Sequence, residues 1–140
     1  GAVEPLGGAR VHKEGSDLTV LSYGAMFHSC VTAVSKVEQE MGVSIEIIDP
    51  RVLKPFDWDT LQASVKKTHK LLVVHESWQA CSIGAWVIAG IMENVFFDLD
   101  APPTLYASPD LPVPFAPELE VEYRPNEIGI EQKIKTLLEM

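Results

Sequence analysis

Short apolar runs alternate along the chain with longer segments in which apolar residues recur at helical spacing, and this alternation most constrains the fold. The strand-like runs lie at residues 18–23, 43–48, 70–74 and 103–107, and the helix-like segments at 25–41, 57–67, 83–99 and from 126 onward. Alternating strand and helix periods are typical of a mostly parallel sheet that is covered by helices on both faces. The sequence therefore predicts an α/β fold of three layers, α/β/α.

A further β-type run at residues 9–13 precedes the first interior strand, and a turn containing Gly15 separates the two. Two β-type runs around such a turn favour adjacent antiparallel strands. We therefore expect a five-stranded, mostly parallel mixed sheet whose first strand is antiparallel. Residues 9–140 are expected to form one domain, because 140 residues suit a single core. Residues 1–8 are expected to be a linker or a remnant of tag removal.

Residue types with known capping roles predict where several helices begin and end. Gly42 follows the first helix, Asp57 precedes the second and Asn126 precedes the last. Glycine is favoured just after a helix, and Asp and Asn just before one. The segment 83–99 is apolar nearly all round, which predicts a helix that is buried on more than one side.

Residues 108–125 are rich in proline and carry no clear period. The five prolines of this segment are Pro109, Pro112, Pro114, Pro117 and Pro125. We expect a rigid irregular loop that is long enough to be functional.

Charge and composition narrow the class of function. The formal net charge is −9, which argues against a nucleic-acid surface and against adsorption to anionic membranes. No stretch reaches the roughly 18 apolar residues that a membrane span needs, and no signal peptide is evident. The two cysteines, Cys30 and Cys81, are expected to be reduced thiols in a reducing compartment.

The stretch 71–86, LLVVHESWQACSIGAW, raises the question of a catalytic or metal site, because His75, Glu76 and Cys81 follow an apolar strand. Their spacing is looser than that of known zinc sites, and a nucleophilic cysteine would need a general base. Ser82 and Gly84 begin the next helix and could present backbone N–H groups to an anion. A packing role for Gly84 is the stronger reading. Residue chemistry alone indicates no catalytic centre and no metal site.

Four segments resemble one known family in the expected order. They are PLGGARVHKEGSDLTVLSYGAM (5–26), IEIIDPRVLKPFDWDTLQASVKKTHKLLVVHES (45–77), GAWVIAGIMENVFFDLDAP (84–102) and PDLPVPFAPELEVEYRP (109–125). The chain is similar to the C-terminal domain of transketolase-like proteins, and best to that of the E1 component beta subunit of 2-oxo acid dehydrogenase complexes of the pyruvate dehydrogenase type.

The resemblance implies that the parent enzyme uses thiamine diphosphate and Mg²⁺ to decarboxylate a 2-oxo acid oxidatively and to acylate the lipoyl arm of E2. No catalytic or cofactor-binding residue is expected in this domain, since the G-D-G…N motif is absent. Its expected role is assembly with the E1 alpha subunit and a second E1 beta subunit in a heterotetramer, with an E2 subunit-binding domain as a further partner. The implied location is the bacterial cytoplasm or the mitochondrial matrix, and the isolated domain is expected to be inactive.

Several residues are candidates for the assembly interface. They are Trp78, Trp86, Asp110, Pro112, Pro114, Phe115, Ile134 and Leu138. The sequence departs from the family pattern after Glu76, where SWQACSIGAW replaces a T-G-G-F-G-A-E type run, so pyruvate and branched-chain oxo acids both stay open. Two alternatives also stay open: the same domain of transketolase or deoxyxylulose-phosphate synthase, and a stand-alone protein-binding module of this fold.

Overall fold

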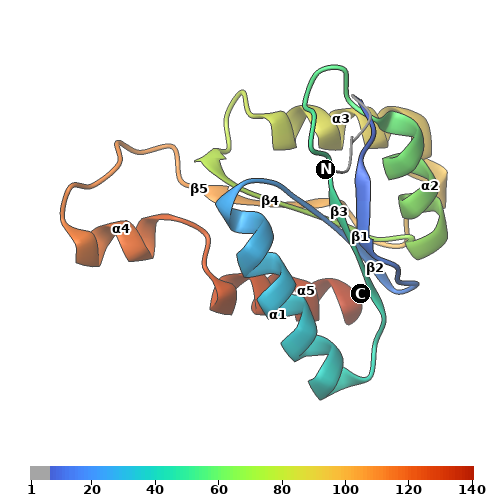
Figure 1. Cartoon of the computed structure of the whole chain (residues 1–140), viewed down its shortest axis with the longest axis horizontal. Helices are drawn as coiled ribbons and strands as arrows, with labels where there is room; N and C mark the ends of the chain where they lie inside the picture. The colour runs from blue at the N-terminus through green and yellow to red at the C-terminus, as the bar shows by residue number, and fades with distance from the viewer. Residues whose placement is uncertain (1–6) are drawn as a thin grey trace, which may run out of the picture.

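The computed structural model describes residues 7–140, so that most of the expected linker at 1–8 lies outside the described residues. The elements follow one another in the order seen in Figure 1. They are β1 (Arg10–Lys13), β2 (Leu18–Ser22), α1 (Ala25–Met41), β3 (Ile45–Asp49), α2 (Trp58–Thr68), β4 (Leu71–Trp78), α3 (Ile83–Val95), the 3₁₀ turn η1 (Phe96–Asp98), β5 (Thr104–Ser108), α4 (Pro117–Tyr123) and α5 (Glu127–Leu138).

The five strands form one mixed sheet in the order β1-β3-β2-β4-β5. The pairs β3–β2, β2–β4 and β4–β5 are parallel, and β1–β3 alone is antiparallel. The predicted fold class is therefore confirmed, including the antiparallel first strand. Because the chain leaves β2 for β3 on one side and returns to β4 on the other, the carboxyl ends of β2 and β4 flank the point where the strand order reverses.

The expected hairpin between the first two strands is wrong. β1 pairs with β3 and not with β2. β2 is buried along its whole length and has parallel partners on both sides, so neither of its edges is open to β1. Three of the four residues of β1 are exposed, as suits an edge strand.

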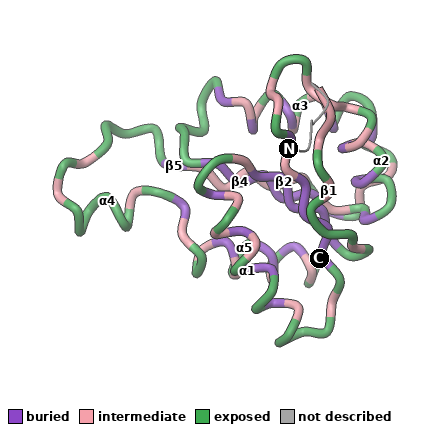
Figure 2. The backbone as a smooth tube through the Cα atoms, viewed as in Figure 1, coloured by how far each residue is buried: buried purple, intermediate pink, exposed green. Residues whose placement is uncertain are grey.

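Two apolar cores lie on opposite faces of the sheet, and helices cover both. Alternate strand residues such as Val20 and Leu72 pack against α1 and α5, which contact each other. Their neighbours Leu21 and Val73 pack with residues of α2 and α3 on the other face. Figure 2 shows the buried sheet between the helices. This alternation follows from the strand period of two, and it makes the molecule a three-layer structure.

The helix ends follow the predicted caps. Gly42 ends α1 in the left-handed region with φ 68°, and its N–H donates to Glu38 O. The carboxylate of Asp57 accepts from Thr60 N at 3.1 Å, and the side chain of Asn126 accepts from Gly129 N at 2.9 Å. The two side-chain contacts satisfy backbone donors that the first turns of α2 and α5 leave free.

Helix α3 is not buried on more than one side within this chain, which corrects the prediction. Its inner stripe, which includes Val87, Ile91 and Val95, is buried in the second core. Its outer side and η1 leave large side chains exposed. They are Trp86, Met92, Phe96 and Phe97. An outer side that is apolar but uncovered is typical of an interaction surface.

The proline-rich segment is not wholly irregular, because residues 117–123 form α4. We call residues 109–124 the arm. Pro117 stands at the start of α4, where proline is tolerated, and Glu118 and Glu120 lie in the first turn, where acidic side chains are favoured. The arm extends away from the body in Figure 1, and α4 buries none of its residues.

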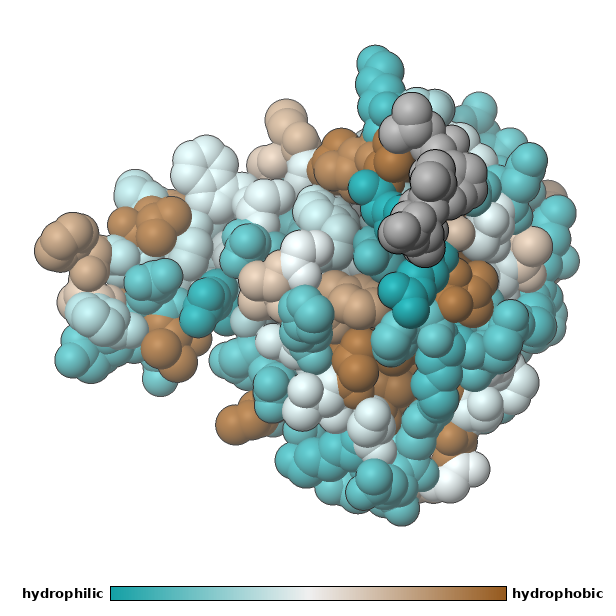
Figure 3. Space-filling model, in the orientation of Figure 1, coloured by the Kyte–Doolittle hydropathy of each residue, from teal (hydrophilic) through white to brown (hydrophobic). Residues whose placement is uncertain are grey.

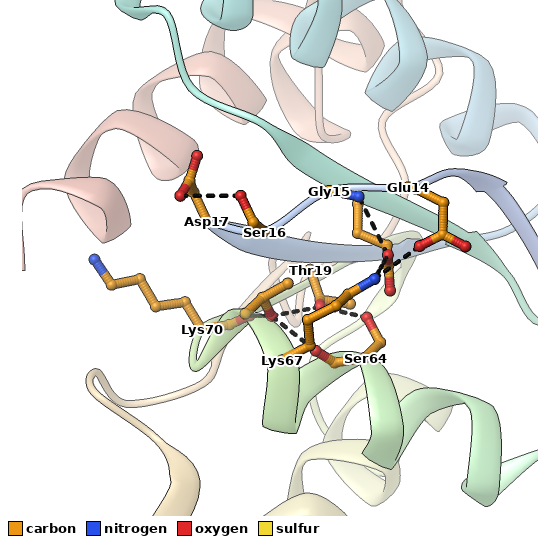
Figure 4. A network of polar contacts seen from close by, with 10 residues as sticks. Glu14, Gly15, Ser16, Asp17, Thr19, Ser64, Lys67 and Lys70 are labelled. Carbon is orange, nitrogen blue, oxygen red and sulfur yellow. Dashed lines mark hydrogen bonds and ion pairs between the residues drawn. The ribbon is translucent and has the colours of Figure 1, made fainter.

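A polar network connects the β1–β2 turn to α2 near the amino end of β2 (Figure 4). The Thr19 hydroxyl lies 2.6 Å from that of Ser64. Lys67 donates to the buried carboxylate of Glu46, which also accepts from Gly15 N at 3.2 Å. Burial alone would raise the pKa of Glu46, but Lys67 and the other hydrogen bonds outweigh it and lower that pKa. The network is structural, because it satisfies polar groups that the fold buries.

Candidate functional site

His75 lies at the carboxyl end of the buried part of β4, with a side chain that is almost wholly enclosed. Its Nε2 lies 3.2 Å from Ser82 Oγ, and its Nδ1 lies 3.3 Å from Ser77 Oγ. Since Ser82 Oγ donates to Gln79 O and accepts from Ala85 N, the consistent tautomer carries its proton on Nε2 and donates it to Ser82. Both ring nitrogens are thus engaged with serine hydroxyls, and neither serves the exposed Cys81 as a general base.

Burial lowers the pKa of His75, so the ring is neutral over a wider pH range than an exposed imidazole. Tyr23, at the end of β2, faces this ring with 6.1 Å between centroids. Burial, and then the charge of Glu76, raises the pKa of Tyr23. Both shifts favour the neutral form of the side chain concerned.

Ser82 and Gly84, the residues of the predicted anion site, both have structural roles here. Ser82 caps α3 through Ala85 N at 3.1 Å. A Cβ added to Gly84 would lie 2.5 Å from His75 Nε2 and 2.6 Å from Leu105 Cδ1. Only glycine lets the helix approach the strands this closely. The packing role of Gly84 is thereby explained, and the anion site stays a prediction.

Among residues 7–140, no three His, Cys, Asp or Glu side chains gather in a way that could hold a metal ion. None of the helices described is long and apolar enough to span a bilayer.

Hydrogen bonds attach both ends of the arm to residues at and just after the end of β4. At one end Asp110 Oδ1 accepts from Ala80 N at 3.1 Å. At the other, Trp78 Nε1 donates to Tyr123 Oη at 2.6 Å, and the Tyr123 hydroxyl donates to Leu111 O at 2.8 Å. We call the contacts of Trp78, Tyr123 and Leu111 the clasp. Two of the predicted interface residues, Trp78 and Asp110, therefore each make a contact that supports the arm.

A surface hollow of about 440 Å³ lies between the loop and the arm. Its lining residues are Glu76, Ser77, Trp78, Ala80, Cys81, Ser82, Val113 and Tyr123. A hollow at a strand end that is bounded by an arm of the same chain is suited to receiving a side chain of a partner.

Apolar side chains are exposed along the arm. Phe115, which was predicted as an interface residue, is fully exposed. Others that sequence reasoning missed are Leu111, Val113, Leu119 and Val121. The signal was the alternation of apolar residues with proline or glutamate in LPVPF and ELEVE. Of the two remaining arm candidates, Pro112 is exposed and Pro114 is half-buried.

A second exposed surface lies on α2 and α3, on the side away from the first core. Trp58 and Trp86 meet with ring centroids 4.9 Å apart, and Phe56 lies 4.8 Å from Trp58. Gly90 allows this cluster, because a Cβ there would lie 2.3 Å from the Trp58 ring. Trp86 is therefore the exposed member of this aromatic cluster, and its place at an interface stays a prediction.

Ile134 does not lie on a surface, which corrects its place among the interface candidates. Its side chain is fully buried in the first core between α1, α5 and the sheet. Leu138 is only partly buried and packs against the same core. The sequence showed an apolar stripe on the last helix, and the first core of this chain already covers that stripe.

Comparison with known proteins identifies the family. The family model described as "Transketolase, C-terminal domain" matches residues 7–130. The pyruvate dehydrogenase E1 component subunit beta of Staphylococcus epidermidis is 40% identical over 134 residues, which are 96% of this chain and 41% of that protein. The subunit of the same name from Bacillus subtilis is 37% identical over 134 residues, again 96% of this chain and 41% of that protein.

The mitochondrial 2-oxoisovalerate dehydrogenase subunit beta of Chaetomium thermophilum is 43% identical over 112 residues, which are 79% of this chain and 24% of that protein. The chain thus spans less than half the length of these relatives. In structure, a split-gene transketolase described as an inactive beta4 tetramer matches with a TM-score of 0.84 at 24% identity, over 98% of this chain and 44% of that one. That likeness shows the fold. The chain therefore belongs to the transketolase C-terminal domain family.

Proposed function

We propose that this chain is the C-terminal assembly domain of a 2-oxo acid dehydrogenase E1 beta subunit. The observation that carries the proposal is the 40% identity, over 96% of the chain, to a pyruvate dehydrogenase E1 beta subunit. The geometry supports it, because the polar groups at the strand ends are engaged with one another while large apolar side chains are exposed on the arm and on α3. A surface of this kind serves association.

The parent enzyme would use thiamine diphosphate and Mg²⁺ to oxidise a 2-oxo acid and would pass the acyl group to E2. This domain would hold neither cofactor. It would contact the E1 alpha subunit and a second E1 beta subunit, with the E2 subunit-binding domain as a further partner. Its place would be a bacterial cytoplasm or a mitochondrial matrix. Pyruvate and branched-chain oxo acids are both candidate substrates, since relatives of both kinds match.

A chimera tests this proposal. The 134 matching residues of the Staphylococcus epidermidis beta subunit are replaced by this chain, and the chimera is produced with the alpha subunit of the same enzyme. We expect the two subunits to co-purify. With thiamine diphosphate and Mg²⁺ they should reduce an artificial electron acceptor when pyruvate or 3-methyl-2-oxobutanoate is added. The natural beta subunit is the positive control.

Two results would overturn the proposal. One is a folded chimera that neither binds the alpha subunit nor supports oxidation of either acid. The other is decarboxylation of a 2-oxo acid by the isolated chain with the cofactor added. If the first result came together with activity after the equivalent graft into transketolase, the transketolase alternative would take its place.

A further inference from the structure

We propose that the arm is a preformed docking element, and that it inserts into an apolar groove of another protein whose rim carries Lys or Arg side chains. This inference rests on the proposed function, because it concerns how the domain engages the E1 assembly. It goes beyond that function by naming the segment, its anchor residue and the chemistry of the surface that receives it.

The arm is held in one shape before any partner binds. The clasp joins Trp78, Tyr123 and Leu111, and Asp110 fixes the other end to Ala80. Pro125 is buried just beyond the arm, and the cap at Asn126 then begins α5. A loop that is already ordered loses less conformational entropy on binding than a flexible one.

The arm presents apolar side chains that this chain does not cover. Leu119 and Val121 are exposed on α4, and Leu111, Val113 and Phe115 are exposed on the segment before it. Figure 3 shows brown, hydrophobic patches on the arm, at the left of the molecule. Since α4 has only seven residues and buries none of them, tertiary contacts with a partner would stabilise it more than its own hydrogen bonds can.

The net charge of the arm indicates which kind of partner binds it. Residues 109–124 contain four acids, Asp110, Glu118, Glu120 and Glu122, and one base, Arg124, which gives 4 − 1 = 3 net negative charges. A second copy of this chain, with its net charge of −9, would place like charges together. The hollow next to α4, of about 670 Å³, is bordered by two acids, Glu122 and Glu127, and by one base, Arg124, so its border is also net negative. A partner with a basic rim is therefore favoured over a second copy.

Phe115 is the anchor residue of this proposal, because it is the fully exposed aromatic side chain of the arm. Aromatic anchors account for much of the binding energy at protein interfaces. The test uses the chimera described above and measures its affinity for the alpha subunit by biolayer interferometry. Phe115→Ser should weaken binding at least about tenfold, as the loss of such an anchor does. The control, Met140→Ser, removes another exposed apolar side chain, one that lies neither on the arm nor on the outer side of α3, and should change affinity less than about twofold.

The charge argument has its own variant. Replacing Glu118, Glu120 and Glu122 by Lys should weaken binding about tenfold or more at low salt, and added NaCl should then weaken the variant less than the unaltered protein. Reversal of three exposed acids outside the arm and outside the aromatic surface of α2 and α3, namely Glu40, Asp100 and Glu139, is the control. Circular dichroism and thermal unfolding verify that each variant is folded.

Preformation is tested by Tyr123→Phe, which removes the hydroxyl that joins Trp78 to Leu111 and leaves Phe115 unchanged. This variant should bind more weakly, and the backbone amides of the arm should exchange faster in the free chimera. Unchanged affinity together with faster exchange would overturn the preformation part of the proposal.

The failures are distinguishable. If the unaltered chimera does not bind the alpha subunit, the proposed function is overturned and the arm proposal with it. If it binds and is indifferent both to Phe115→Ser and to the three Lys substitutions, only the arm proposal is overturned. Concentration-dependent dimerisation of the isolated chain that Phe115→Ser abolishes, seen by sedimentation, would identify a second copy as the occupant and would also overturn it.

Discussion

His75 shows how one buried polar side chain can organise a loop. Its two nitrogens engage Ser77 and Ser82, and Ser82 in turn caps α3. The end of β4 and the loop after it contribute Trp78 and Ala80 to the supports of the arm. A buried residue at the carboxyl end of a parallel strand therefore helps to order the segment that supports the arm.

The contact between Gly84 and His75 gives a prediction at the residue scale. Gly84→Ala should lower the free energy of unfolding by about 1–3 kcal/mol, because a Cβ would meet His75 and Leu105 at less than 3 Å and the site would be overpacked. Urea denaturation followed by tryptophan fluorescence measures this. Gly8→Ala is the control, since a Cβ there has nothing within 4 Å. Equal stability of the two variants would contradict the tight packing described.

The burial of His75 predicts a pH dependence. Its pKa is lowered in the folded protein from the ordinary value of 6.5, so below that pH the unfolded chain binds a proton that the folded chain does not. The free energy of unfolding should therefore fall as the pH falls below the ordinary value of 6.5. The lowered pKa values of Glu46 and Asp57 act at lower pH, because these carboxylates lose their stabilising charge only there.

The measurement is urea denaturation at pH 7.5 and pH 5.5. His75→Gln should reduce the difference in stability between the two pH values, whatever its effect on stability at pH 7.5. His28→Gln, at an exposed position on α1, should leave that difference as it is in the unaltered chain. A difference that survives in His75→Gln would assign it to another group.

At the scale of elements, sequence and structure agree where a local signal fixes the answer. The capping residues Gly42, Asp57 and Asn126 define helix ends because each supplies a conformation or an acceptor that a helix end needs. Strand pairing is not local. The turn at Gly15 was compatible with a hairpin, but β2 uses both of its edges for parallel partners, and β1 had to pair elsewhere.

The arm shows a second limit of sequence reasoning. Its prolines predicted a rigid irregular loop, yet residues 117–123 form α4, whose first residue is itself a proline. The clasp could not be predicted, because Trp78 and Tyr123 are 45 positions apart and only the fold brings them together. Ile134 and Trp86 were equally apolar in the sequence, and only the packing of α5 and α3 decides which of them is buried.

The two helix caps give a prediction at this scale. Asn126→Ala should lower the free energy of unfolding by about 1 kcal/mol, the usual loss for an N-cap. Asp57→Ala should lower it further, because Asp57 also accepts from Thr60 Oγ1 at 2.8 Å and from Ala9 N at 2.9 Å. Burial alone would raise the pKa of Asp57, but these hydrogen bonds outweigh it and lower that pKa. Chemical denaturation at pH 7 measures both variants. An equal loss would mean that the bond to Ala9 adds nothing to stability.

For the whole molecule, stability and association are assigned to different parts. The two cores lie between the sheet and its helices, where α1 with α5 and α2 with α3 cover opposite faces. The arm contributes no buried residue from α4, and α3 faces a core on one side only. The exposed apolar residues therefore lie where a partner can cover them without any rearrangement of the cores.

This separation predicts that the arm can be made flexible at little cost to the fold. Replacing residues 112–122 by a Gly-Ser linker of equal length keeps Asp110, Leu111 and Tyr123, and should change the free energy of unfolding by less than about 1 kcal/mol, as surface changes usually do. Ile130→Ala, which removes a fully buried side chain of the first core, should lower it by about 2–5 kcal/mol. Thermal and urea unfolding of both variants measure the contrast. Since the linker variant keeps the cores and loses Phe115 and the three glutamates of α4, it should fold normally and bind the alpha subunit in the chimera at least about tenfold more weakly than the unaltered protein. If the linker cost as much stability as Ile130→Ala, the arm would be part of the cooperative core, and its exposed side chains would need another explanation.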